Sequence, residues 1–325
     1  MRIVIVGGGT SGWMTAAAFC KTFPDWDITM INGGDAIGVG ESTTPHINQY
    51  LSYMGIPDEV FLPAARATFK SSSRFEGFVK EGEVFHYPNG QSITQTVKFQ
   101  EWMLAKAFHP EGLPPFSQLF MPFVAVAEAG RLPLNKDILD PYDLAKDRSF
   151  HINGAAFSNF LRDTFCKDLK VVNSTVKSVA TKGRNIEHVV VAGGPYKLGG
   201  EKVFGDLFID CSGQQAVVGG ALSKWKPYDS IVTDSALVVK TDYTDRATEM
   251  VPYTNAKAMT AGWQWTIPTY DFLSRGYVFC SKFQSEEDAR KEFGYDDARL
   301  IKFENGRHER AWTGNCVSIG LSFGF

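Results

Sequence analysis

The sequence predicts an α/β fold in which a parallel sheet is intertwined with a second β-sheet module. Two observations predict the parallel sheet: a short apolar strand at 2–6 runs into a glycine-rich turn, and a helix pattern then leads to an apolar strand at 27–31. A strand, helix, strand order of this kind needs a crossover, which makes the two strands parallel. The second sheet is predicted by strand-like segments at 236–243, 263–270 and 276–283.

The composition is that of a folded chain with a substantial core. Of its 325 residues, 44% are hydrophobic and 21% are charged, and the net charge is -3. Lysines and arginines are scattered, so we expect no nucleic-acid partner. The five cysteines form no CxxC pair, which predicts reduced thiols and a cytoplasmic location. The first apolar run spans only residues 3–6, and no stretch reaches the length of a membrane span, so no membrane association is expected.

Between the two sheets the chain alternates helix and strand patterns. A Gly, Ser, Thr and Pro-rich loop at 35–50 leads into a helix, and residues 84–135 mix aromatics and prolines without a clean period. Residues 151–169 predict an amphipathic helix. The segments 171–183, 185–193 and 202–213 then predict a β-meander that ends in a buried strand.

The turn after the first strand carries a dinucleotide-binding motif. Gly7, Gly9 and Gly12 form GxGxxG between a strand and a helix, with Thr10 and Ser11 inside it. The first glycine permits the tight turn, the second lets the backbone approach a pyrophosphate, and the third lets the helix pack on the strand. The pyrophosphate is then expected at the helix N-terminus, where unpaired N–H groups favour an anion.

Two further polar positions have open interpretations. Asn32 stands where an acidic residue usually binds the ribose, with Asp35 close by; it can bind a hydroxyl, or it can only make the turn before Gly33. Asp210 ends a buried strand before Gly213. Such a corner resembles the one that approaches the flavin in flavoproteins, although Asp210 can instead cap the following helix.

Several segments together resemble the flavin-dependent halogenases, of the tryptophan halogenase type. The match rests on GGGTSGWMTAA from residue 7, GVGESTTPHI from Gly38, ATFK ending at Lys70, and WxWxIP, formed by Trp263, Trp265, Ile267 and Pro268. HINGAAFSNFL, DLFIDCSG, GYVFCSKF and the last 25 residues also resemble family segments. The resemblance covers the whole chain and is weakest at 76–150. It implies an FAD-binding, Rossmann-like fold of the flavoprotein monooxygenase type.

The resemblance also implies a chemistry. Reduced FAD, O2 and halide yield hypohalous acid, and Lys70 delivers electrophilic halogen to an electron-rich aromatic substrate of indole or phenol type. A separate flavin reductase would supply the reduced FAD. Gly40, Glu41 and Ser42 would lie in a strap that contacts the flavin. The WxWxIP residues would form a wall between flavin and substrate. Without the resemblance, Lys70 would be taken for a surface lysine and the two tryptophans for core residues.

Neighbouring polar residues carry weaker expectations. His46 has no acid or cysteine near it in the sequence, so we expect no metal site. Arg74, four residues after Lys70, can share a helical face with it or be exposed. For Glu41 a structural or flavin-side role is favoured, and a solvated loop charge is the alternative.

The resemblance implies a discontinuous FAD-binding module at 1–75, 151–215 and 291–325 and a substrate-side module at 76–150 and 216–290. In the family a Glu-Pro-Leu-Glu run, whose first Glu partners the lysine, and a helical C-terminal region follow the segment that ends here at Phe325. Both lie outside this sequence. Two alternatives to a halogenase therefore remain, a truncated, non-catalytic flavin-binding remnant and a flavin monooxygenase. The apolar residues 311–325 predict self-association, which sedimentation would test.

Overall fold

The computed structural model describes residues 1–34, 38, 40–90, 98–130, 147–193 and 200–325. The chain forms two compact units. Unit 1 comprises 1–38, 154–234 and 302–325, and unit 2 comprises 39–153 and 235–301. The division falls at other points than those of the expected modules. Residues 39–75 belong with unit 2, because their strands pair with strands of that unit, and residues 216–234 belong with unit 1.

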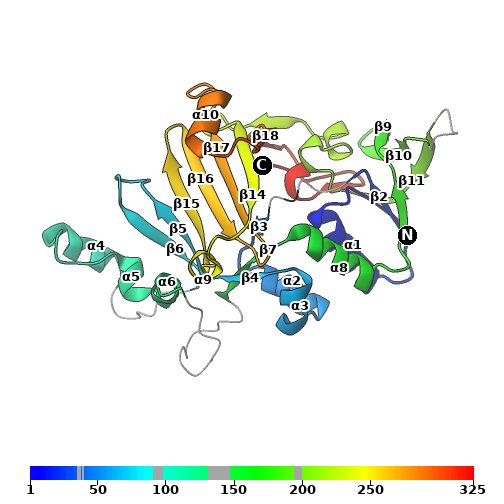
Figure 1. Cartoon of the computed structure of the whole chain (residues 1–325). Helices are drawn as coiled ribbons and strands as arrows, with labels where there is room; N and C mark the ends of the chain where they lie inside the picture. The colour runs from blue at the N-terminus through cyan, green and yellow to red at the C-terminus, as the bar shows by residue number, and fades with distance from the viewer. Residues whose placement is uncertain (35–37, 39, 91–97, 131–146, 194–199) are drawn as a thin grey trace. The chain divides into compact units, whose positions relative to one another are not determined.

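Unit 1 is built on a parallel sheet, as the sequence predicts (Figure 1). Its strand order is β20 (Trp312–Thr313), β21 (Cys316–Ser318), β12 (Leu207–Asp210), β1 (Arg2–Val6), β2 (Asp27–Asn32) and β8 (Lys170–Asn173). The pairs from β21 to β8 are parallel, and only the short β20 is antiparallel to its neighbour. The strands from β12 to β2 are almost fully buried, which is why they are rich in Ile and Val.

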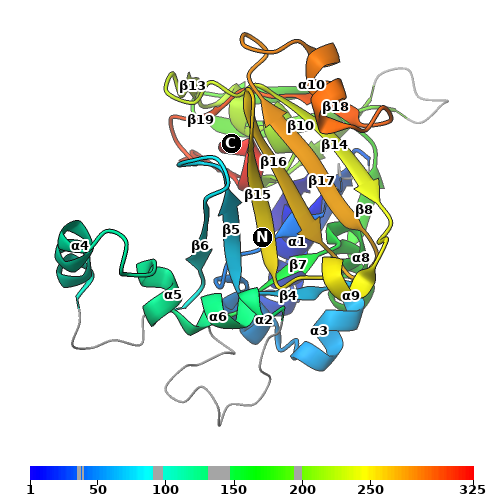
Figure 2. The same ribbon diagram turned by 60° about the vertical axis from the view of Figure 1, so that its left-hand side comes forward.

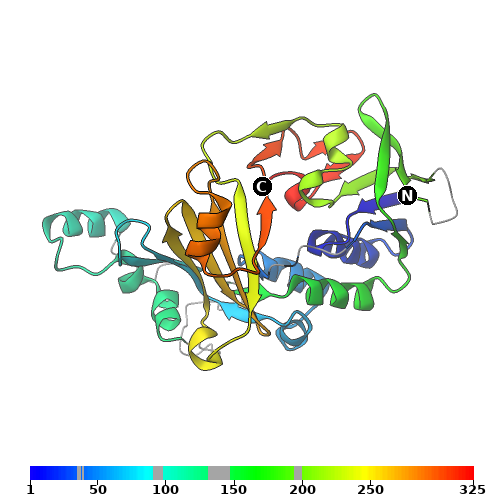
Figure 3. The same ribbon diagram turned by 45° about the horizontal axis from the view of Figure 1, so that its top comes forward.

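Helices and a meander pack on this sheet. Helix α1 (Thr10–Thr22) connects β1 to β2 and lies beside α8 (Gly154–Phe165) (Figure 3). The three-stranded meander β9 (Val176–Lys182), β10 (Asn185–Val191) and β11 (Glu201–Phe204) shares a core with the sheet through Val4, Val6 and Phe208. The prediction for 171–213 is correct in part, since β8 joins the parallel sheet before the meander begins.

The carboxyl end of the chain packs into unit 1. Strands β20 and β21 join the sheet, and the short 3-10 helix at Gly320–Ser322 follows them. Strand β19 (Gly306–His308) pairs with β13 (Trp225–Pro227). Trp312, Leu321 and Phe325 stay exposed within 311–325. Whether these side chains support self-association stays a prediction.

Unit 2 is built on a seven-stranded sheet (Figure 2). Its order is β18 (Arg299–Lys302), β14 (Ser235–Thr241), β17 (Leu273–Phe279), β16 (Gly262–Pro268), β15 (Tyr253–Met259), β5 (Ser72–Glu76) and β6 (Val84–Pro88). The three strands predicted from the sequence correspond to β14, β16 and β17, which are consecutive in this sheet. Strands β15 and β5 run parallel, and β14, β17, β16 and β15 pair antiparallel in turn. Helix α10 (Glu286–Phe293) packs on β14 and β17.

A second, small sheet in unit 2 has the order β3 (Glu41–Ser42), β7 (Ser149–Ile152) and β4 (Thr68–Lys70). The helix predicted from residue 151 is corrected here, because 149–152 form the central strand β7 and α8 begins only at Gly154. The loop predicted at 35–50 is shorter than expected, because it contains β3 and α2 (Ile47–Met54) begins within it; its residues 35–37 and 39 lie outside the described residues. Helix α3 (Asp58–Ala64) follows α2. The remaining helices of the described residues are α4 (Phe99–Phe108), α5 (Phe116–Phe120), α6 (Pro122–Glu128) and α9 (Arg246–Glu249). Within the described ranges, no helix is both long and apolar enough to cross a membrane.

Candidate active site

Three tight turns meet at one edge of the unit 1 sheet. They follow β1, β12 and β21, which are neighbours and run parallel. The carboxyl ends of parallel strands are where ligands bind in open α/β sheets. The predicted residues Gly7, Asp210 and Gly213 therefore lie on the same edge, together with the segment at Gly320 that the sequence analysis did not single out.

The glycines of the first turn are required by space. Gly7 has φ 115°, and a Cβ there would lie 2.2 Å from the carbonyl oxygen of Cys211. A Cβ on Gly12 would lie 1.9 Å from the Gly7 carbonyl oxygen. Both glycines therefore let backbone approach backbone, the first between the turns after β1 and β12 and the second between helix and turn.

Helix α1 begins at this turn without a side-chain cap. Gly9 is its N-cap residue, no side chain accepts a hydrogen bond at this cap, and no acidic residue lies in the first turn. The first-turn residues Thr10 and Ser11 follow, and a Cβ on Gly320 would lie 3.5 Å from the Ser11 hydroxyl oxygen. An uncapped helix start favours an anion such as a pyrophosphate, because its first N–H groups lack acceptors within the helix.

The Asp210 carboxylate shapes the second turn. It is fully buried. One oxygen accepts hydrogen bonds from the Ser212 backbone N–H (2.9 Å) and hydroxyl (2.6 Å), and the other from the N–H groups of Val218 and Gly219 (2.7 Å each). This is the capping interpretation rather than direct flavin contact by the carboxylate. Gly213, with φ 74° and no atom within 4 Å of a Cβ position, begins the part of the turn that stays open.

Asn32 ends β2 with its side chain against the first turn. A Cβ on Gly8 would lie 2.0 Å from the Asn32 carbonyl oxygen Oδ1. That oxygen accepts from Gly34 N–H at 3.4 Å, and Nδ2 lies 3.4 Å from the Asn173 side-chain oxygen. The long Gly34 bond agrees with a turn-making role, and ribose binding stays a prediction. Asp35 lies outside the described residues.

The small sheet of unit 2 brings together the predicted strap and Lys70. Gly40, with φ 85°, lies so close to β17 that a Cβ would be 2.9 Å from the Ser274 Cβ. Next to it, Glu41 and Ser42 pair with Ile152 and His151 of β7. Lys70 pairs with Ser149 on the other side of the same strand. Residues 30 positions apart in the sequence thus become neighbours in space.

Lys70 is a buried lysine with a single hydrogen bond to the protein among those described. Its side chain is 7% exposed, and its Nζ donates to the Thr43 carbonyl oxygen at 3.1 Å. Burial lowers the pKa of Lys70 from 10.5 to about 8, since the charged ammonium loses its hydration. The amine is therefore available in both protonation states near neutral pH, as either form of the expected chemistry requires.

His151, which the sequence pattern did not single out, lies on the central strand of the small sheet. Its ring is fully buried. Nδ1 lies 3.3 Å from the Thr68 hydroxyl and Nε2 lies 2.9 Å from the Thr254 hydroxyl. Burial first, and then the charge of Lys70, lowers the pKa of His151 to about 3. The alternation Ser-Phe-His-Ile at 149–152 was the signal for a strand that would have placed this histidine beside Lys70.

The fold is expected to lose stability in acid because of His151. Between pH 6.5 and about 3 the unfolded chain binds a proton that the folded chain does not, so the free energy of unfolding falls as the pH falls through this range. The full effect is on the order of 5 kcal/mol, of which about 3 kcal/mol is lost between pH 6.5 and pH 4. Urea unfolding at pH 7 and pH 4 measures it, and the His151→Phe variant should lose a smaller share of its stability. An equal loss in both proteins would contradict the assignment.

The WxWxIP strand is β16, and its indoles pack as a pair. The rings of Trp263 and Trp265 are 6.2 Å apart at an angle of 54°. The Trp265 ring covers Gly276 of β17, where a Cβ would lie 2.0 Å from the indole, and its Nε1 donates to Ser274 at 3.2 Å. Ile267 and Pro268 are buried. The Pro268 carbonyl accepts from the Thr68 hydroxyl at 2.6 Å, so this strand contacts the strand that carries Lys70.

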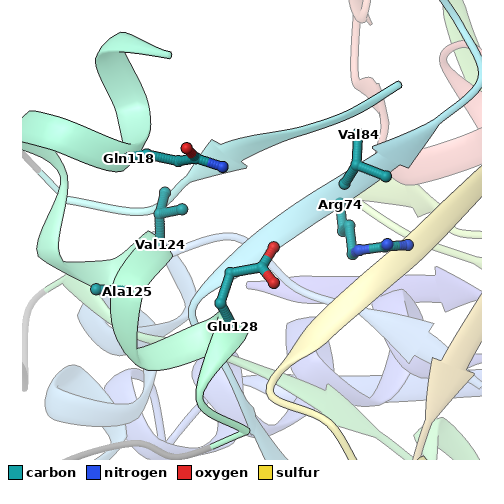
Figure 4. A pocket seen from close by; sticks show the side chains of 6 residues that line it. All are labelled: Arg74, Val84, Gln118, Val124, Ala125 and Glu128. Atoms are coloured by element: carbon teal, nitrogen blue, oxygen red, sulfur yellow. The ribbon is translucent and has the colours of Figure 1, made fainter. Parts of the chain in front are cut away.

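Arg74 lies on β5, not on a helical face shared with Lys70, because 68–70 and 72–76 are strands. It lines a hollow of about 490 Å3 with Glu128, Gln118 and three small apolar side chains (Figure 4). Arg74 donates to Glu76 (3.0 Å) and Asn255 (2.9 Å), and Glu128 bonds His86 (2.7 Å). The charged groups of this hollow are thus already paired within the protein.

Comparison with known proteins agrees with this geometry. The sequence pattern that defines the tryptophan halogenase family matches residues 2–325. Tryptophan 6-halogenase SttH from Streptomyces toxytricini is 30% identical over 100% of this chain and 67% of its own length.

Two solved structures have the same fold. The apo structure of VirX1 superposes with a TM-score of 0.89 and 34% identity, over 100% of this chain and 65% of that one. BrvH, a flavin-dependent halogenase from Brevundimonas sp. BAL3, superposes with a TM-score of 0.84 and 28% identity, over 100% of this chain and 67% of that one. The chain therefore spans about two thirds of the length of its relatives. By sequence and by fold, it belongs to the tryptophan halogenase family of flavin-dependent enzymes.

Proposed function

We propose that this chain halogenates an electron-rich aromatic ring, of indole or phenol type, and that Lys70 delivers the halogen. The observation that carries the proposal is the buried Lys70 amine, whose pKa of about 8 leaves it reactive near neutral pH. A structural lysine gains nothing from burial, since the desolvation of its charge costs stability. The relative SttH is a tryptophan 6-halogenase, which supports an aromatic substrate of indole type.

The first turn of unit 1 fits a dinucleotide. Side chains at Gly7 and Gly12 would collide with backbone, and α1 starts there without a cap. We propose that Gly7, Gly9, Thr10, Ser11 and Gly12 hold the FAD pyrophosphate through backbone N–H groups.

The other proposed flavin contacts have less support from the local geometry. Asn32 and Gly213 have polar or open backbone surroundings at the same edge, Asp210 acts by shaping the turn, and Gly40, Glu41 and Ser42 form the proposed strap in unit 2. Bound reduced FAD, supplied by a separate reductase, would provide with O2 the two-electron oxidation of halide to hypohalous acid. The WxWxIP strand is proposed to separate flavin and substrate.

Lys70 can act on hypohalous acid in either protonation state. The neutral amine forms an N–halogen bond while the halogen–oxygen bond breaks and water leaves; the aromatic carbon then takes the halogen, the ring loses its proton, and the amine is restored. The ammonium instead gives a proton to the hydroxyl of the acid while the carbon–halogen bond forms and the halogen–oxygen bond breaks, so that water leaves; the proton lost by the ring then restores the ammonium. The surroundings of Lys70 permit both, because burial places its pKa near the working pH.

The test is a coupled reaction with a flavin reductase, NADH, FAD, O2 and bromide or chloride on a panel of indoles and phenols. Mass spectrometry should find a product in which halogen replaces one hydrogen, and only when halide is present. Flavin binding without any product would favour a non-catalytic flavin-binding protein. Halide-independent gain of oxygen would favour a monooxygenase. Either of these outcomes would overturn the proposal.

A further inference from the structure

A buried imidazole joins the segments that surround Lys70. His151 lies on β7, directly between Ser42 of β3 and Thr68 of β4. Its Nδ1 reaches Thr68, and its Nε2 reaches Thr254, whose hydroxyl lies 2.8 Å from that of Ser42. One side chain therefore connects the strap, the lysine strand and the large sheet.

These hydrogen bonds form a series, and the direction of each follows from the bond between Thr68 and Pro268. The only proton of the Thr68 hydroxyl goes to the Pro268 carbonyl, which can only accept. Thr68 must then accept from His151, so Nδ1 carries the ring proton and Nε2 is an acceptor. Thr254 consequently donates to Nε2 and accepts from Ser42. In this series of hydrogen bonds, from Ser42 to Pro268, each donor faces an acceptor.

Two residues of this hydrogen-bond series, Thr68 and Ser42, lie close to Lys70 or to its hydrogen-bond partner. Thr68 lies two residues before it on the same strand, so both side chains point to the same face of the small sheet. Ser42 lies one residue before Thr43, whose carbonyl holds the Lys70 Nζ at 3.1 Å. The imidazole thus fixes the backbone that carries the lysine and also the backbone that receives its amine.

The imidazole can make both of these hydrogen bonds only while it is neutral. A second proton on Nε2 would oppose the donor hydroxyl of Thr254. The positive charge of Lys70 lowers the pKa of His151, as burial also does, so both oppose protonation of the imidazole. The neutral ring therefore leaves Lys70 without a competing positive charge over the whole range in which the amine titrates.

We propose that His151, as its Nδ1–H tautomer, is the positioning residue for Lys70. It holds the amine against the Thr43 carbonyl and keeps it away from water. The catalytic meaning of this role rests on the proposed function, whereas the positioning itself does not.

Nitrogen-15 NMR of histidine-labelled protein tests the tautomer directly. His151 should show a protonated Nδ1 and an unprotonated Nε2 from pH 8 down to about pH 5, while an ordinary exposed histidine titrates near 6.5. A protonated Nε2 in the neutral ring, or titration near pH 6.5, would overturn the proposal.

Two variants test the positioning. His151→Phe keeps an aromatic ring of slightly larger size and removes the hydrogen bonds of the imidazole, and His151→Gln keeps one amide donor and one amide acceptor. The pH midpoint for acetylation of Lys70, read peptide by peptide by mass spectrometry, should rise by about one unit in the Phe variant and by less in the Gln variant. The control is His86→Gln, which also removes a buried histidine of unit 2 but should leave the midpoint unchanged.

In the coupled reaction, His151→Phe should lower kcat by roughly tenfold or more with little change in KM, with partial rescue in His151→Gln. An unchanged acetylation midpoint in a folded Phe variant would contradict the positioning role. If the wild-type protein forms no halogenated product while the midpoint still shifts as expected, the proposed function fails and the positioning role stands.

Discussion

Replacing Lys70 by methionine is expected to abolish halogenation while making the fold more stable. Methionine fills the space of the lysine side chain without a charge to desolvate. Loss of the residue that delivers the halogen should lower kcat by roughly a hundredfold or more, since a positioned acid, base or nucleophile contributes at least that factor. A purely structural residue would show the opposite pattern, with stability and activity lost together.

The gain in stability should depend on pH in a defined way. Below pH 8 both the folded and the unfolded chain hold the lysine proton, and the folded chain bears the full cost of the buried charge. Between about 8 and 10.5 the unfolded chain binds more protons, so the free energy of unfolding of the wild type rises with pH. The Lys70→Met variant should therefore exceed the wild type by about 3 kcal/mol at pH 7 and by less than about 1 kcal/mol near pH 10.

Urea unfolding of both proteins at the two pH values measures this difference. The matched control is Lys257→Met, which removes an exposed lysine from β15 of the same unit and should change neither stability nor kcat by more than a small amount. A Lys70→Met protein that is less stable than the wild type at pH 7 would contradict the burial argument.

Alanine at Gly7 is expected to destroy flavin binding. A Cβ there would lie 2.2 Å from the Cys211 carbonyl oxygen and 2.5 Å from the Cys211 carbonyl carbon, so β1 and β12 would have to separate at the edge where the turns meet. Backbone atoms cannot rotate out of the way as a side chain can. We expect a loss of about 3 kcal/mol in the free energy of unfolding and at least about a 30-fold weaker affinity for FAD.

Gly183 provides the control for this substitution. It has φ 62° in the turn between β9 and β10, and no atom lies within 4 Å of its Cβ position. Gly183→Ala should cost only about 1 kcal/mol of backbone strain and leave FAD binding unchanged. Flavin fluorescence quenching and urea unfolding measure both effects. Equal FAD affinities of the two variants would show that the first turn is not the pyrophosphate site.

The sequence predicted the parts of the molecule whose structure is local. The β1, α1, β2 unit and the roles of Gly7 and Gly12 follow from a pattern of adjacent residues with one geometric solution. Strands β14, β16 and β17 are also local, because each contains β-branched or aromatic residues close together in the sequence. These elements were confirmed.

What the sequence could not supply depends on contacts between distant segments. Strand β7 owes its existence to pairing with β3 and β4 on either side, and so the isolated pattern at 151–169 favoured a helix. His151 was missed for the same reason. Asp210 was recognised as important, but only the folded turn shows that four donors occupy its carboxylate.

The most direct test of the account compares the wild type with Lys70→Met in the coupled reaction. Both proteins are compared at equal bound FAD and at equal release of hydrogen peroxide, which reports the reaction of reduced flavin with O2. The account predicts a halide-dependent, halogenated aromatic product from the wild type and at most a trace from the variant, although both bind FAD alike. Equal product from the two proteins would contradict the central claim, because the halogen would then reach the aromatic ring without Lys70.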